Sequence, residues 1–399
     1  MIFYAHNRYS RGENYDFQPR FLRGPSMKVL TIGGATQDIF LHYAGADAMS
    51  ITKKNFTHNY MLFESGEKVE IENVTYFTGG GATNSATSFS RLGLDTSCFC
   101  VIGNDSAGSQ VLQDLKQEKV TTSFIYQSSE HRTGLSCIIN AVRGDRTVLA
   151  YRGANSYLEL NKLPFDEIKK SNLLYITSLS NDSAQLLPDI VSFAKKHHIP
   201  VAINPGVSQL ASGTLTLKKS LQDIDILILN SSEARTFMLA LVETDETYKT
   251  MFEGTASANP CALNAPSTDP YLMNMSLYCE DAYFSMPKFF QEVLTMGPKT
   301  VVVTNGANGV YVVTNHTMYF HPSMKINVMN TVGAGDAFGS CFVASLLRGQ
   351  DVPTALRSGI INSASVLSML GAKAGLLTYD QLTTQLSTLS PDLLQTLPM

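Results

Sequence analysis

Short apolar runs alternate along this chain with amphipathic segments of helical period. The run KVLTIGG at 28–34 ends in two glycines, which is typical of a buried strand that enters a loop. Further strands are predicted at 95–103, 172–178, 200–206, 225–230 and 299–306, and helices at 82–93, 107–120, 184–198 and 232–242. Strands that are apolar throughout and separated by helices indicate a parallel sheet covered on both faces. Ligands of such sheets bind beyond the carboxyl ends of the strands.

Three regions break this alternation. Residues 39–78 and 133–152 alternate as strands do, which predicts a small antiparallel sheet inserted twice into the α/β domain. Residues 245–285 are rich in Pro, Asn and Ser and predict an irregular insertion, either an inert surface loop or a segment that reshapes a nearby site. Residues 1–26 are polar and have no period, so we expect a flexible extension ahead of a domain at 27–399.

Composition narrows the class of partner. The chain has 399 residues and is 44% hydrophobic, enough for one large domain or two. Its 30 basic and 34 acidic side chains leave a formal charge of -4, so no overall basic field attracts nucleic acid or an anionic membrane. No apolar run approaches the roughly 20 residues of a membrane span. The six cysteines contain no CxxC pair, so neither disulfides nor a zinc site is predicted. We expect a cytoplasmic protein with a small-molecule partner.

The stretch NTVGAGDAF at 330–338 leads into an apolar helix. Glycines allow a tight turn there, and the first helical turn offers unpaired N–H groups that bind an anion. Asp336 at the helix start either satisfies the helix dipole or acts as a general base. Three small residues, Gly333, Ala334 and Gly335, directly precede it, and a helix cap alone does not require such a run. Phosphoryl transfer is the reaction that uses both an anion hole and a base.

NTVGAGDAF, TGGGATNSATSFSRLG at 78–93 and the strand followed by GGATQD at 28–38 together resemble the ribokinase-like (PfkB) carbohydrate and nucleoside kinases. The resemblance covers about 27–385, and the sequence has neither a GxxxxGK[ST] loop nor GxGxxG spacing. It implies a three-layer α/β/α domain with a mostly parallel sheet, and a lid built from 39–78 and 133–152. It also implies ATP- and Mg²⁺-dependent phosphorylation of a hydroxyl group and a homodimer formed through the lid.

The same resemblance assigns roles to individual residues. It makes Asp336 the base, and the anion hole Gly333, Ala334 and Gly335. It implies that the substrate is bound by Asp38, Gly80, Gly81 and Asn84. It implies that the nucleotide is bound by Asn230, Glu233, Thr304, Gly306, Gly309, Thr331 and Asn362. Glu233 would also hold Mg²⁺ through water. Without the resemblance, Asn230 and Glu233 read as a helix N-cap and 301–313 as a plain hairpin.

The identity of the acceptor stays open. A monosaccharide or sugar acid is our first expectation, a nucleoside the second, and a catalytically silent ligand-binding protein the third. Aromatic residues of the lid either stack on a base or form the lid core: Phe56, Tyr60, Phe63, Tyr76 and Phe77. Arg132 and Arg152 either grip a carboxylate or end solvated strands. Where the ribokinases carry an aspartate of a monovalent-cation site, six residues before the base, this chain has Asn330, so potassium dependence is not settled by the sequence.

Overall fold

The computed structural model describes residues 27–43, 47–53, 56–140, 146–255, 277–279, 282–315 and 317–398. The predicted extension at 1–26 and the middle of the predicted insertion, 256–276, lie outside the described residues. Among the helices that are described, none is long and apolar enough to cross a membrane.

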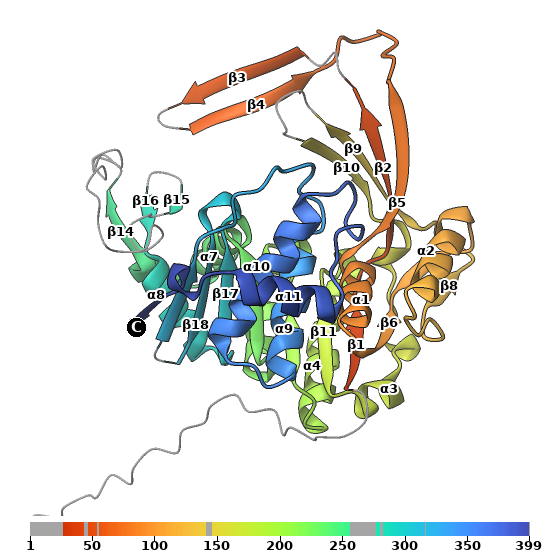
Figure 1. Ribbon diagram of the computed structural model, residues 1–399. Helices are drawn as coiled ribbons and strands as arrows, with labels where there is room; N and C mark the ends of the chain where they lie inside the picture. The colour runs from red at the N-terminus through yellow and green to blue at the C-terminus, as the bar shows by residue number, and fades with distance from the viewer. Residues whose placement is uncertain are drawn as a thin grey trace, which may run out of the picture.

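A nine-stranded sheet forms the centre of the molecule (Figure 1). Six strands are parallel, in the order β6 (Asp95–Phe99), β1 (Lys28–Ile32), β11 (Leu173–Ile176), β12 (Val201–Ile203), β13 (Ile226–Asn230) and β17 (Thr300–Thr304). Three antiparallel strands complete it, β18 (Val310–Thr314), β19 (Thr317–His321) and β20 (Gln395–Pro398). The predicted mostly parallel sheet is confirmed. The strand predicted at 95–103 divides at Cys100, and β7 (Val101–Gly103) pairs instead with β8 (Tyr126–Ser128).

Helices cover both faces of the sheet. Successive side chains of a strand point to opposite faces, so each strand contributes to two different cores. Val29 packs in one core, with α1 (Gly81–Arg91), α9 (Ala334–Leu347), α10 (Val352–Leu367) and α11 (Tyr379–Thr388). Leu30 and Ile32 pack in the other, with α3 (Phe165–Lys170), α4 (Leu187–Lys196), α5 (Val207–Leu210), α6 (Thr214–Ser220), α7 (Ser231–Thr244) and α8 (Met286–Thr295). A third cluster joins α2 (Ser106–Gln117) to α1 and β6. The result is the predicted three-layer α/β/α arrangement.

A second, four-stranded sheet rises from the end of β1 (Figure 1). It contains β10 (Arg146–Tyr151), β9 (Gly134–Asn140), β2 (Thr36–His42) and β5 (Asn73–Gly79) in that order. Both predicted inserted segments contribute to it. The outer pairings are antiparallel, whereas β2 and β9 run parallel. A separate hairpin, β3 (Asp47–Lys53) with β4 (Phe56–Leu62), extends from this small sheet.

The predicted irregular insertion is partly ordered. A 3₁₀ helix at Glu246–Met251 leads into β14 (Phe252–Thr255), which forms a three-stranded sheet with β16 (Ala282–Phe284) and β15 (Leu277–Cys279). The strands have three or four residues, too few to leave a periodic signal in the sequence. The expectation of an irregular segment was therefore wrong for these residues.

Candidate active site

The predicted site residues gather where the parallel strands end. β1 runs into Gly33 and Gly34 and then into the small sheet, while β13 ends at Asn230 and β17 at Thr304. Asn230 and Thr304 are opposite each other in the strand register. Because the carboxyl ends of parallel strands share one edge of a sheet, the residues predicted to bind substrate and those predicted to bind nucleotide meet there.

The N-terminus of α9 is open to an anion. Gly333 caps the helix in the left-handed region, with φ of 81°, and a β-carbon at this position would be 2.5 Å from that of Ala372. Within the described chain no side chain caps this helix, and nothing lies within 4 Å of a β-carbon built on Gly335. The first amides of the helix, at Ala334, Gly335 and Asp336, therefore remain available.

Asp336 is hydrogen-bonded to the substrate-side motif. Asn84 Nδ2 donates to Asp336 Oδ2 at 2.8 Å. Deeper in the same seam between α1 and α9, Ser340 Oγ donates to Ser88 Oγ at 2.7 Å. These two contacts give Asn84 and Ser88, both on the buried α1, polar partners on α9. Two motifs far apart in the sequence thus form one site.

The carboxyl group of Asp336 has a strongly shifted affinity for protons. Burial raises its pKa to about 6, and the nearby carboxylates of Glu233 and Asp38 act in the same direction. The hydrogen bond from Asn84 and the charge of Lys373 lower the pKa but do not cancel the effect of burial. A carboxylate with a pKa close to neutral is a better general base than an ordinary aspartate.

Asp38 lies against the glycine turn. It is 4% exposed, it accepts a 2.9 Å hydrogen bond from Thr36 Oγ1, and burial raises its pKa. A β-carbon on Gly79 would be 2.0 Å from Asp38 Oδ2, so the carboxylate and the turn are in direct contact. Gly80 has a φ of 96°, which lets the turn enter α1. Asn84 Oδ1 is buried without a hydrogen-bond partner among the described residues and so can accept from a ligand.

Asn230 and Glu233 form a capping box at the start of α7. Asn230 Oδ1 accepts from Glu233 N, and Glu233 Oε2 accepts from Asn230 N, both at 2.8 Å. Both residues therefore cap the helix, as the sequence alone suggested. The capping bond uses one carboxylate oxygen of Glu233 and leaves the other for further contacts. Burial raises the pKa of Glu233, whereas hydrogen bonds from Asn230 and Asn204 lower it. Asn204, which follows β12, was not singled out from the sequence.

The remaining predicted nucleotide residues differ in their surroundings. Gly306 and Gly309 form the turn between β17 and β18, with φ of 52° and 106°. Thr331 Oγ1 is buried without a partner in the described part of the chain. Asn362 is fully buried, donates to Ala337 O at 2.9 Å and accepts from Leu377 N at 3.0 Å. Because its amide is used inside the protein, this placement does not favour contact with a base, and Asn362 is left out of the proposal below.

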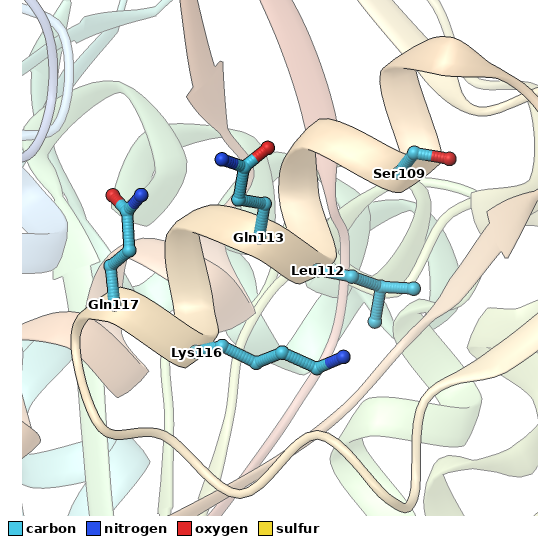
Figure 2. A pocket seen from close by; sticks show the side chains of 5 residues that line it. All are labelled: Ser109, Leu112, Gln113, Lys116 and Gln117. Carbon is cyan, nitrogen blue, oxygen red and sulfur yellow. The ribbon is translucent and has the colours of Figure 1, made fainter.

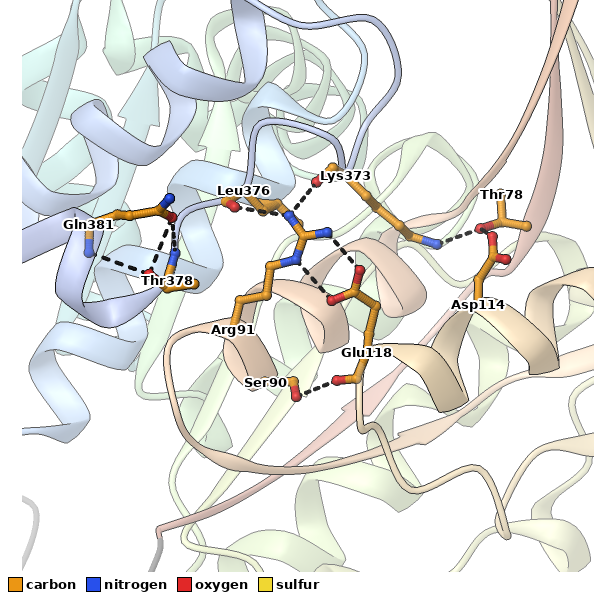
Figure 3. A network of polar contacts seen from close by, with 9 residues as sticks. All are labelled: Thr78, Ser90, Arg91, Asp114, Glu118, Lys373, Leu376, Thr378 and Gln381. Carbon is orange, nitrogen blue, oxygen red and sulfur yellow. Dashed lines mark hydrogen bonds and ion pairs between the residues drawn. The ribbon is translucent and has the colours of Figure 1, made fainter.

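Lys373 is a site residue that the sequence did not reveal (Figure 3). Its ammonium group donates to Thr78 Oγ1 at 2.9 Å, and Thr78 donates to Asp114 Oδ2 at 2.6 Å. Arg91 binds both carboxylate oxygens of Glu118 and donates to the carbonyl of Lys373. Burial lowers the pKa of Lys373 to about 8, and the Asp114 and Asp38 carboxylates oppose this shift. The loop after α10 is thereby tied to β5 of the small sheet.

The side chains considered for substrate discrimination do not form one cluster. Phe77 packs edge-on against Phe40, with ring centroids 5.5 Å apart, whereas the side chains of Tyr60, Phe63 and Tyr76 are exposed. The side chain of Phe56 lies outside the described ones. Arg132 and Arg152 are both exposed beside the small sheet.

A surface hollow of about 500 Å³ lies along α2 (Figure 2). It is lined by Ser109, Leu112, Gln113, Lys116 and Gln117. All five side chains come from one helix, and none belongs to the predicted site. The hollow lacks the convergent polar groups of a ligand site, so the cluster around Asp336 remains the candidate.

Known proteins place the chain in a family. Residues 47–258 and 286–378 match the family model described as pfkB family carbohydrate kinase. The ribokinase of Staphylococcus aureus is 26% identical over 319 residues, which cover 78% of this chain and 90% of that protein. The chain therefore belongs to the pfkB family of carbohydrate kinases. It is a phosphotransferase with a hydroxyl group as acceptor, as the sequence predicted.

Solved structures share the fold. The ribokinase of Arabidopsis thaliana, complexed with ribose and ATP, superposes with a TM-score of 0.68 at 16% identity, covering 90% of this chain and 99% of that one. A nucleoside kinase of Methanocaldococcus jannaschii gives a TM-score of 0.66 at 16% identity, covering 92% and 100%. The predicted ribokinase-like fold is confirmed. The two scores are too close for the fold to separate a sugar from a nucleoside acceptor.

Proposed function

We propose that this kinase transfers the γ-phosphoryl group of ATP to a hydroxyl group of a monosaccharide or sugar acid. Asp336 acts as the general base, and the backbone amides of Gly333, Ala334 and Gly335, at the cap and first residues of α9, form the anion hole. The observation that carries the proposal is the 2.8 Å hydrogen bond from Asn84 to Asp336. This bond joins Asn84, to which we assign contact with the acceptor, and Asp336, to which we assign removal of its proton, and it supports their acting together at a helix end that attracts phosphate.

The described residues fit a nucleotide and magnesium. The uncapped amides of α9 and the unpartnered hydroxyl of Thr331 offer donors to phosphate oxygens, and Glu233 keeps a carboxylate oxygen beyond its capping bond. Thr304, Gly306 and Gly309 border the nucleotide, and Asn230 with Glu233 holds Mg²⁺ through water. When bound, ATP supplies the phosphoryl group and Mg²⁺ neutralises charge on its phosphates.

Each protein group has a defined task. Asp38, beside the turn at Gly80 and Gly81, accepts hydrogen bonds from acceptor hydroxyl groups, and Asn84 Oδ1 accepts another. Asp336 takes the proton of the reacting hydroxyl as phosphate arrives. The amides at the start of α9 stabilise the charge on the transferring group. The small sheet acts as a lid that excludes water from the reaction.

A monosaccharide is the first choice of acceptor, because relatives of this chain include ribokinases, one of which was solved with ribose and ATP. A nucleoside remains the alternative, since a nucleoside kinase shares the fold. Among the described lid aromatics, Tyr60, Phe63 and Tyr76 are exposed, so these three rings do not enclose a base, which favours the sugar.

The test is a panel of sugars, sugar acids and nucleosides with ATP and Mg²⁺, read by ADP release. Asp336→Asn keeps the shape of the side chain and its bond to Asn84, so we expect a fall in turnover of roughly 10²- to 10⁴-fold. Asp351→Asn, at the exposed N-cap of α10, is the matched control and should retain activity.

The outcomes separate the hypotheses. Equal turnover by wild type and Asp336→Asn would contradict the role of the base. Turnover of nucleosides alone would favour the alternative acceptor. Binding of a sugar without ADP release by wild type would indicate a silent binding protein.

We further propose that the kinase works in the cytoplasm as a homodimer joined through the lid. The strand register places Leu149, Cys137, Ile39 and Tyr76 in one row across the small sheet. Asp38 is on the opposite face, because neighbouring residues of a strand point to opposite faces. Tyr76 and Leu149, at the ends of the row, are 61% and 58% exposed, which suits burial against a second copy.

A further inference from the structure

Two loops meet where the chain enters α9. One loop, 322–333, follows β19, and the other, 368–378, follows α10. Met329 N, in the first loop, donates at 2.8 Å to Leu367 O, at the end of α10 where the second loop begins. Gly333 packs closely on Ala372, since a β-carbon built on Gly333 would lie only 2.5 Å from the β-carbon of Ala372. The position of the α9 amides therefore depends on how these loops are held together.

Asn330 is the side chain that joins the two loops. It is 7% exposed, its Nδ2 donates to Met369 O, and its Oδ1 accepts from Val332 N at 2.7 Å. One neutral amide thus satisfies a carbonyl of one loop and an N–H group of the other. Asn330, which makes both bonds, lies six residues before Asp336.

An aspartate at this position would behave differently. A carboxylate has only acceptor atoms, so its second oxygen would face the Met369 carbonyl without a hydrogen between them. Two such oxygens in a buried place need a cation or a proton. The aspartate that the ribokinases carry here belongs to a monovalent-cation site. The donor set of this chain does not fit a cation between these groups, because the Asn330 amide directs an N–H group, which cannot bind a cation, at the Met369 carbonyl.

We infer that the Asn330 amide replaces a monovalent cation, so that the loops and the α9 amides are held in place without potassium. The substitution also keeps the local charge unchanged, since it omits one negative carboxylate together with one positive ion. The catalytic consequence rests on the proposed function, whereas the structural consequence does not.

The test compares wild type, Asn330→Asp and Asn330→Ala in KCl, NaCl and tetramethylammonium chloride at equal ionic strength. Thermal unfolding of the ligand-free protein is measured first, and ADP release second. We expect the wild-type Tm and turnover to be the same in all three salts. For Asn330→Asp we expect a Tm lower by roughly 2–6 °C in tetramethylammonium chloride, with recovery in KCl or NaCl. Asn330→Ala loses both bonds without creating an oxygen pair, so its loss should not depend on the salt.

Two results would overturn the inference. One is a wild-type Tm or turnover that drops when potassium and sodium are replaced by tetramethylammonium. The other is an Asn330→Asp variant that folds but responds to salt no more than Asn330→Ala. If Asn330→Asp does not fold, the wild-type comparison alone decides. Failure of the proposed function would appear as absence of ADP release in every salt and would leave the thermal comparison intact.

Discussion

At the scale of single residues, Asp336 combines two conflicting demands. Its carboxylate must be close to the uncapped amides of α9, yet enclosure there raises its pKa to about 6. Asn84 offsets part of this effect, because a hydrogen bond donated to the charged form stabilises it. The balance leaves a carboxylate that is mostly ionised at neutral pH and still accepts a proton readily, as the proposed base must.

This balance predicts the pH dependence of turnover. The base must be deprotonated, so kcat/KM should be constant between about pH 7 and pH 8 and fall about tenfold per unit as the pH drops below about 6. Removal of the donor in Asn84→Ala should move this acid limb to higher pH by roughly one unit. The measurement is a pH profile of ADP release under first-order conditions in substrate. A profile that stays flat down to pH 5 would count against Asp336 as the base.

The residues that the sequence could predict are those inside recognisable motifs. GAGD and GGGATN pointed to Asp336 and Asn84, and the structure brings them within one hydrogen bond. Lys373 and Asn204 could not be predicted, because their contacts depend on loops brought together by the fold. Asn362 was predicted to contact the nucleotide, but its amide bonds to Ala337 O and Leu377 N inside the protein. Its position in a helix gives no information on such bonds.

At the scale of elements, the loop after α10 supports the small sheet. Lys373 binds Thr78 on β5, one residue before the glycine turn that we propose faces the acceptor. Because the Arg91 guanidinium fixes the carbonyls of Lys373 and Leu376, the ammonium group is held in place from behind. The strand that carries the acceptor turn is therefore anchored by a cation from a distant part of the chain.

Lys373→Met should loosen this anchor. The variant preserves much of the side-chain volume but removes the bond to Thr78, so we expect KM for the acceptor to rise about tenfold with a smaller change in kcat. In wild type, KM should also rise as the pH passes about 8, where Lys373 loses its proton, and the variant should lack this rise. Lys116→Met, on the exposed face of α2, is the control. An unchanged KM in Lys373→Met would refute the anchoring role.

Elements were predictable where their hydrophobic pattern was long. The buried strands of the parallel sheet and the helices between them lie at the predicted places. Ends were less predictable, and the helix expected at 184–198 becomes α-helical only at Leu187, next to Pro188, after a 3₁₀ segment. The parallel pairing of β2 with β9 had no local signal, because it joins segments about a hundred residues apart.

At the scale of the whole molecule, the row of apolar side chains on the small sheet predicts association. Size-exclusion chromatography with light scattering should give twice the mass of one chain. The double variant Tyr76→Lys, Leu149→Lys should give a single chain, because it puts two charges where each copy buries apolar surface. Leu215→Lys changes another exposed apolar residue, on α6, and should leave the mass unchanged. A monomeric wild type would exclude the proposed dimer.

The seam between α1 and α9 has a consequence for how the protein acquires activity. The Asn84–Asp336 and Ser88–Ser340 bonds each join residues 252 positions apart, so closing them costs more chain entropy than forming any single hairpin or helix. During refolding we therefore expect the circular dichroism of the helices to return before turnover does. Recovery of catalysis would report the moment at which the two distant parts of the chain meet.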